Sequence, residues 1–239
     1  FKLSIITTPP SVEYLLHLTS DTTLKIHSAG EFPDPSSIRV AMEPIMLVSV
    51  FAPSEYTGDV MQLCQDKRGE YVHLEYIGTQ ACLRRQVKFT YLIPLSEMIV
   101  DFFDNLKAIT SGYASLDFEF YEMRPVEVVK MDILFNKDKI DAFSQIVLKD
   151  RVVVKGRIMV EKLKEIIPRQ QFQVPIQAVI GGKIIARADV KSFRKDVTGK
   201  LYGGDQSRKD KLLDAQKKGK KKMKKFGNVE IPSDVFIRL

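Results

Sequence analysis

The spacing of apolar residues between Glu43 and Met123 constrains the fold of this chain most strongly. Apolar and polar residues alternate in four stretches, which is typical of strands, and two stretches with helical spacing lie among them. The strands are expected at 43–53, 71–78, 81–94 and 114–123, and the helices at 57–69 and 95–112. The resulting order, βαββαβ, predicts a ferredoxin-like split sandwich.

The two helices of this unit carry their own signals. Thr57 is a candidate N-cap for the first helix and Gly69 a candidate C-terminal stop. The second helix has one apolar side, formed by Met98, Ile99, Phe102, Phe103, Leu106 and Ile109. We expect that side to face the sheet.

A second small α+β domain is predicted from residue 127 to residue 239. Two strand patterns flank Lys137–Lys139 and predict a hairpin. An amphipathic helix is expected at 157–168, with Ile158, Val160, Leu163, Ile166 and Ile167 facing a core. A second hairpin is expected at 171–190, with Gly181 and Gly182 in its turn.

The first 42 residues do not form a complete unit by pattern. Residues 1–20 are strand-like, have no partner strands before them, and are interpreted as the remnant of a preceding domain. Residues 21–42 are rich in turn residues and are interpreted as a connector. The chain is therefore expected to be a piece of a longer protein.

Charge is distributed unevenly along the chain. Residues 1–150 contain 14 Lys and Arg against 21 Asp and Glu, whereas residues 151–239 contain 23 against 9. Such a basic half indicates a polyanionic partner, which can be a nucleic acid or an anionic membrane surface.

The basic charge is densest between Lys183 and Lys225, within a basic tail at 191–239. Asp205 can cap a helix that runs through the lysine run, with Leu212, Ala215, Gly219 and Met223 as a narrow apolar stripe for docking. Lysines suit phosphates without reading bases, and Tyr202 and Phe226 offer aromatic faces for stacking. The alternative is a solvated, disordered tail.

Catalytic signals are lacking in the sequence. It contains no phosphate-binding loop, no dinucleotide-binding glycine motif and no nucleophile elbow, and its three histidines lack metal-ligand spacing. No stretch approaches the ~18 apolar residues of a membrane span. Cys64 and Cys82 lie in apolar contexts and are expected to be buried, reduced thiols. We therefore expect no catalytic site, metal or cofactor in this chain.

Three stretches resemble the LepA (elongation factor 4) family of translational GTPases. Residues 202–236 (YGGDQSRKDKLLDAQKKGKKKMKKFGNVEIPSDVF) and 167–197 resemble the family's C-terminus. The unit at 43–123, with EPIMLVSVFAPSEYTGDV and DKRG, resembles the domain that LepA shares with the C-terminus of elongation factor G. The family usually has Cys before the Tyr-Gly-Gly-Asp motif, where this chain has Leu201; an apolar role suits either residue.

The resemblance implies a layout and a function. Residues 1–20 would end the third domain, 43–123 would be the elongation factor G-like fifth domain, and 127–239 the LepA-specific domain. The family binds 70S-type ribosomes, ribosomal RNA and tRNA, and its C-terminal domain reaches toward the tRNA acceptor arm and the peptidyl transferase centre. Its roles are given as GTP-dependent back-translocation, ribosome rescue or ribosome assembly. GTP and Mg²⁺ would belong to a G domain that this sequence does not contain.

Charge and resemblance together give the expected RNA-binding residues. They are Lys183, Arg187, Lys191, Arg194, Lys195, Lys200, Tyr202, Arg208, Lys209, Lys211, Lys217, Lys218, Lys220, Lys221, Lys222, Lys224 and Lys225. We expect a monomer in the bacterial cytoplasm, with a mitochondrion or chloroplast as the alternative, and a tail that stays mobile from about Lys195 until RNA surrounds it. The competing interpretation is a polybasic peripheral membrane or protein-interaction module, since lysine runs also bind anionic lipid.

Overall fold

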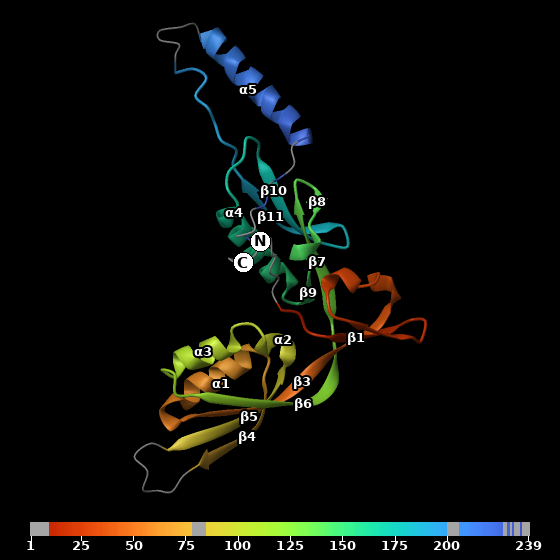
Figure 1. Cartoon of the computed structure of the whole chain (residues 1–239), viewed down its shortest axis with the longest axis vertical. Helices are drawn as coiled ribbons and strands as arrows, with labels where there is room; N and C mark the ends of the chain where they lie inside the picture. Colours follow the sequence, from red (N-terminus) through yellow and green to blue (C-terminus); the bar gives the residue numbers. More distant parts are fainter. Residues whose placement is uncertain are drawn as a thin grey trace, which may run out of the picture. The chain divides into compact units, whose positions relative to one another are not determined.

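The computed structural model describes residues 10–77, 85–199 and 206–226, together with Val229, Ile231 and Val235; for Lys225 and Phe226 it describes the backbone alone. The chain divides into two compact units (Figure 1). One is Pro9–Glu127 and the other is formed mainly by Val128–Leu239. Each contains helices and an antiparallel sheet, which confirms the predicted α+β class.

The first unit contains the predicted ferredoxin-like order. Its elements are β3 (Ile38–Pro53), α1 (Thr57–Asp66), β4 (Glu70–Ile77), β5 (Gln86–Pro94), α2 (Leu95–Met98), α3 (Phe102–Ile109) and β6 (Ser115–Val126). The strands pair antiparallel in the order β6-β3-β5-β4, so the first strand of the motif lies between the third and the fourth. This is the arrangement that the βαββαβ order predicts.

The core of the first unit lies between this sheet and its helices. Val48, Val50 and Phe89 of the sheet are fully buried, and so are Phe102 and Leu106 of α3. These residues form one cluster, in which burial of apolar surface stabilises the contact of helix and sheet.

The single helix expected at 95–112 is two helices. Asp101 lies between α2 and α3 with φ of +60°, a left-handed conformation that a continuous α-helix cannot contain. The break turns part of the predicted apolar side outward, so Ile99 and Phe103 are exposed.

The N-terminal residues extend the same sheet. β1 (Tyr14–Leu18) pairs with β2 (Thr23–Ile26) and also with the first residues of β3, between Ile38 and Met42. The stretch interpreted as a connector thus contains β2 and the start of β3. Four 3₁₀ turns complete the set of elements: η1 (Ala29–Glu31), η2 (Pro35–Ser37), η3 (Ser54–Tyr56) and η4 (Asp141–Phe143).

The two ends of α1 differ in how far the sequence foretold them. Thr57 is the first residue of the helix and not its N-cap, which is Tyr56; the Thr57 hydroxyl instead donates to the Ser54 carbonyl oxygen at 2.8 Å. At the other end the Gly69 amide donates to the Cys64 carbonyl oxygen at 2.7 Å. A Cβ at Gly69 would lie 2.6 Å from that oxygen, so the close approach requires glycine.

The second unit is a five-stranded sheet with α4 packed on it. Its elements are β7 (Val128–Phe135), β8 (Asp138–Lys139), β9 (Gln145–Leu148), α4 (Val152–Ile166), β10 (Val174–Ile180), β11 (Lys183–Val190) and α5 (Gln206–Phe226). The sheet order is β11-β10-β7-β8, with β9 also paired to β7, and α4 contacts β10 and β11. Both predicted hairpins are present, and Gly181 and Gly182 have φ of +52° and +86° in the second turn.

The core of the second unit joins α4, the sheet and the C-terminal residues. Met131, Leu163 and Ile176 are fully buried, and Val235 near the end of the chain is 1% exposed in the same cluster. Ile158 was expected in this core but is 52% exposed. Val235 therefore contributes to the stability of the second unit, because its side chain belongs to the core.

Candidate nucleic-acid interface

Helix α5 carries most of the expected RNA-binding residues that the structure describes. Arg208, Lys211, Lys217, Lys218, Lys221 and Lys222 are exposed, whereas Lys209, Lys220 and Lys224 are half-buried. Lys225 lies in the helix, and Lys200, Tyr202 and Asp205 lie outside the described residues. The exposed lysines project from more than one side of the helix, because residues one apart are separated by about 100°.

The half-buried side of α5 is not the predicted apolar stripe. Residues 209, 213, 216, 220 and 224 are spaced three and four apart and are all half-buried. Leu212 and Met223 of the predicted stripe are 38% and 54% exposed. The sequence interpretation therefore chose the wrong side of the helix for docking.

Polar contacts hold this side of α5 to the rest of the second unit. The Gln216 amide Nε2 donates to the Lys195 carbonyl oxygen at 2.8 Å. The Lys220 ammonium donates to the Ser192 hydroxyl at 3.1 Å and to the Phe193 carbonyl oxygen. The Asn136 amide donates to the Lys224 carbonyl oxygen at 3.0 Å. Lys220 is thus a structural contact of the helix, although the sequence assigned it to RNA.

The remaining expected residues lie on β11 and on the segment after it. Lys183, Lys191, Arg194 and Lys195 are exposed. Arg187 is also exposed, but its guanidinium donates to the Asp189 carboxylate at 3.0 Å, which partly neutralises its charge. The structure brings Arg194 together with α5, since both line one cleft.

A turn just before α5 fixes the chain after this segment. The Asp196 carboxylate accepts hydrogen bonds from the Thr198 amide, the Thr198 hydroxyl and the Gly199 amide, at 2.9, 2.9 and 3.0 Å. The bonds from Thr198 are the main reason that the pKa of Asp196 lies below its usual value. This side chain is occupied with its own backbone, which leaves the neighbouring cations without it as a close ion-pair partner.

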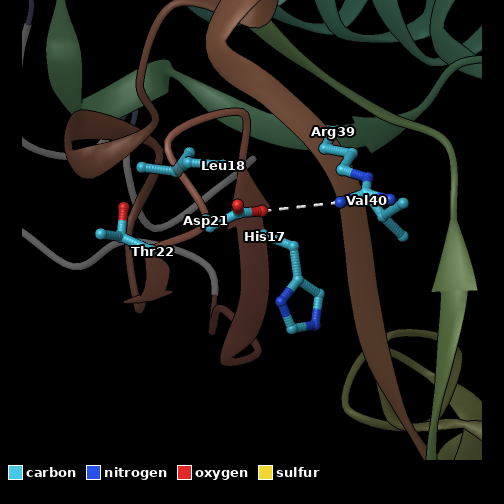
Figure 2. Close-up of a pocket in the computed structure, with 6 residues that line it drawn as sticks. All are labelled: His17, Leu18, Asp21, Thr22, Arg39 and Val40. Carbon is cyan, nitrogen blue, oxygen red and sulfur yellow. Dashed lines mark ion pairs between the residues drawn. The ribbon is translucent and has the colours of Figure 1, made fainter.

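A second, smaller cleft of about 260 Å³ lies at the turn between β1 and β2 (Figure 2). Asp21 and Arg39 form an ion pair across it at 3.6 Å, and both side chains are largely exposed. His17 points away from that pair, and its Nδ1 lies 3.2 Å from the Thr23 hydroxyl. A solvated pair of this kind contributes little energy and offers no activated nucleophile or base.

The sequence analysis missed a buried ion pair in the first unit. The Glu43 carboxylate is 2% exposed and accepts hydrogen bonds from the Arg68 guanidinium, at 3.2 Å for Nη1, and from the Ser96 hydroxyl at 3.3 Å. Burial opposes the charge of Arg68, but Glu43 outweighs it and raises the Arg68 pKa. Burial and the Glu43 charge together raise the pKa of the nearby Tyr14 to about 12. A glutamate inside an otherwise apolar strand was the signal in the sequence.

Other kinds of site find little support in the described residues. Among them, His, Cys, Asp and Glu nowhere gather in a group of three suited to a metal ion. No helix in the described part of the chain is apolar enough over its length to cross a membrane. Burial raises the pKa of the Cys64 thiol to about 12, so it is a poor nucleophile.

Comparison with known proteins places both units. Residues 135–239 match the sequence model of the family described as "GTP-binding protein LepA C-terminus", and residues 40–134 match "Elongation factor G C-terminus". Elongation factor 4 of Bacillus cereus (strain B4264) is 49% identical over 237 residues, and that of Streptococcus pneumoniae (strain Hungary19A-6) is 50% identical over 237 residues.

The extent of these matches is uneven between the proteins. Each alignment covers 99% of this chain but 38% of the relative. A crystal structure of a Thermus thermophilus protein aligns with 36% of this chain and 12% of its own, with 29% identity and a TM-score of 0.32, and no argument is based on it. Two adjoining domain matches and relatives identical at about half of the positions identify this chain as a member of the LepA (elongation factor 4) family, of which it represents the C-terminal part.

Proposed function

We propose that this chain is the ribosome- and RNA-binding part of a LepA-type translation factor that works in the bacterial cytoplasm. The printed name of the relatives, elongation factor 4, supports a role in translation. The observation that carries the RNA-binding role is the exposure of lysines on α5 while the half-buried side of the helix is held in place. Held in this way, the lysines can meet phosphates without first ordering the helix.

The back-translocation, rescue and assembly roles attach to this proposal at the level of the whole protein. In each of them the basic second unit would contact tRNA or ribosomal RNA near the acceptor arm. GTP hydrolysis and its Mg²⁺ would be supplied by another part of the protein. The chain by itself would bind ribosomes without hydrolysing GTP.

The experiment is cosedimentation with 70S ribosomes across a KCl series. Deleting everything after Asp205 would be a poor variant, because it also removes Val235 from the core. We therefore replace four exposed lysines of α5 by glutamine, in K211Q/K217Q/K218Q/K222Q. The matched control, K137Q/K149Q/K155Q/K162Q, removes the same charge from four exposed lysines elsewhere in the same unit.

Binding that weakens in the α5 variant and persists in the control supports the proposal. Equal binding by both variants would place ribosome recognition elsewhere in the chain. Vesicles containing anionic phospholipid provide the comparison for the membrane alternative. Stronger binding to these vesicles than to ribosomes would favour that alternative.

A further inference from the structure

A cleft of about 520 Å³ lies between α5 and the segment that follows β11. Five cationic side chains and one carboxylate line it: Arg194, Lys217, Lys220, Lys221, Lys224 and Asp214. The volume falls within the range of about 300–1,000 Å³ that is usual for small-molecule sites. A nucleotide with its phosphate therefore fits the space, and the charge of the walls favours an anion.

The cations of the cleft have two different roles. Lys220 is bound to Ser192 and Phe193, and the backbone of Lys224 is held by Asn136, so these two residues fix the helix against its wall. Lys217 and Lys221 are exposed and one helical turn apart, with Cβ atoms about 5–6 Å from each other by helix geometry. Within the described residues no ion pair joins Lys217, Lys221 or Arg194 to a carboxylate.

We infer that this cleft binds one phosphate group of an RNA strand between Arg194 on one wall and Lys217 and Lys221 on the other. The inference rests on the proposed RNA-binding function and assigns it a defined position. The guanidinium of Arg194 can donate two parallel hydrogen bonds to phosphate oxygens, while the lysines act as point charges. Lys218 and Lys222, which do not line the cleft, provide diffuse attraction only.

The test compares two double variants that differ only in which side of α5 they alter. K217Q/K221Q removes two lysines of the cleft, and K218Q/K222Q removes two exposed lysines outside it. Both pairs have the same spacing in the same helix, and glutamine keeps a similar helix propensity. The probe is a fluorescently labelled 12-nucleotide oligouridine, and its binding to the full chain is measured by anisotropy across a KCl series.

We expect K217Q/K221Q to bind the oligouridine at least about tenfold more weakly, and its log–log salt slope to fall by about 1 per lysine. We expect K218Q/K222Q to lose less than about threefold. Equal losses in the two variants would overturn the inference, since affinity would then follow net charge alone. R194K keeps the charge and loses the guanidinium fork; unchanged affinity in this variant would overturn the position given to Arg194.

The proposed function and the phosphate site in the cleft can fail separately. A wild-type chain that binds neither ribosomes nor oligouridine contradicts the proposed function itself. A wild-type chain that binds both, with equal losses in the two lysine pairs, leaves the proposed function in place and removes the cleft. Far-ultraviolet circular dichroism and thermal melting of each variant show whether it is folded, and all the substituted residues are exposed.

Discussion

The buried pair of Glu43 and Arg68 supports a quantitative prediction for the first unit. Arg68→Met keeps most of the apolar side chain and removes the charge, which leaves the Glu43 carboxylate, 2% exposed, with the Ser96 hydroxyl at 3.3 Å. Breaking a buried ion pair from one side costs about 3–5 kcal/mol. Arg68 is 27% exposed, so water already solvates part of the pair. We therefore expect a loss of about 2–3 kcal/mol in unfolding free energy.

Two further variants separate the stranded charge from the lost hydrogen bonds. Glu43→Gln in the Arg68→Met background removes the buried charge, and we expect the double variant to be more stable than Arg68→Met alone. Arg39→Met, which breaks the exposed Asp21 pair at 3.6 Å, is the control and should cost less than about 0.5 kcal/mol.

Hydrogen exchange of the β3 and β5 amides is the suitable assay, because it reports opening of the first unit separately from the second. A global transition would combine the two units and need not be two-state. The reasoning is refuted if Arg68→Met and Arg39→Met lose the same free energy, or if the double variant loses the sum of its two single losses.

Three other predictions concern the same unit. Tyr91 is fully buried and its hydroxyl lacks a hydrogen-bond partner among the described residues, so Tyr91→Phe should leave the urea midpoint unchanged or raise stability by up to about 1 kcal/mol; a loss above that size would reveal a partner. Gly69→Ala should cost about 1–3 kcal/mol, because its Cβ would meet the Cys64 carbonyl oxygen, while Gly58→Ala, which meets nothing within 4 Å, should not lower the melting temperature. In a Cys82→Ser background, the raised pKa of Cys64 keeps its thiolate scarce below about pH 12, so Ellman's reagent at pH 8 should titrate no thiol in the native protein and one in urea; native labelling would contradict the burial.

The strands were predictable because a strand buried on one face shows its period directly. Val48 and Val50 of β3 and Ile176 and Ala178 of β10 alternate with less buried residues, and all four are at 0% exposure. Glycine pairs such as Gly181-Gly182 fix a turn by their backbone freedom alone. These signals are local, so they survive without knowledge of the partner elements.

Other features depend on contacts that no local pattern contains. The left-handed residue Asp101 splits a helix that its apolar spacing makes continuous. α5 docks through Gln216 and Lys220, polar residues whose carbonyl partners lie some 20 to 30 residues earlier in the chain. The apolar spacing instead favoured Leu212 and Met223, which are exposed. The candidate cleft required the structure for the same reason, because Arg194 joins the lysines only through that docking.

The balance of forces on α5 bears on whether it is held before RNA arrives. A hydrogen bond of this kind contributes about 0.5–1.5 kcal/mol, so the bonds from Gln216, Lys220 and Asn136 give a modest total. Against them, like charges three or four residues apart, such as Lys217 with Lys221 and Lys218 with Lys222, each oppose the helix by about 0.2–0.5 kcal/mol. Because salt screens the repulsion more than it weakens the hydrogen bonds, docking of α5 should strengthen as salt rises while RNA binding weakens. The prediction that the tail is mobile without RNA therefore applies at low salt, where heteronuclear relaxation of the α5 amides would test it, and a rigid helix there would contradict it.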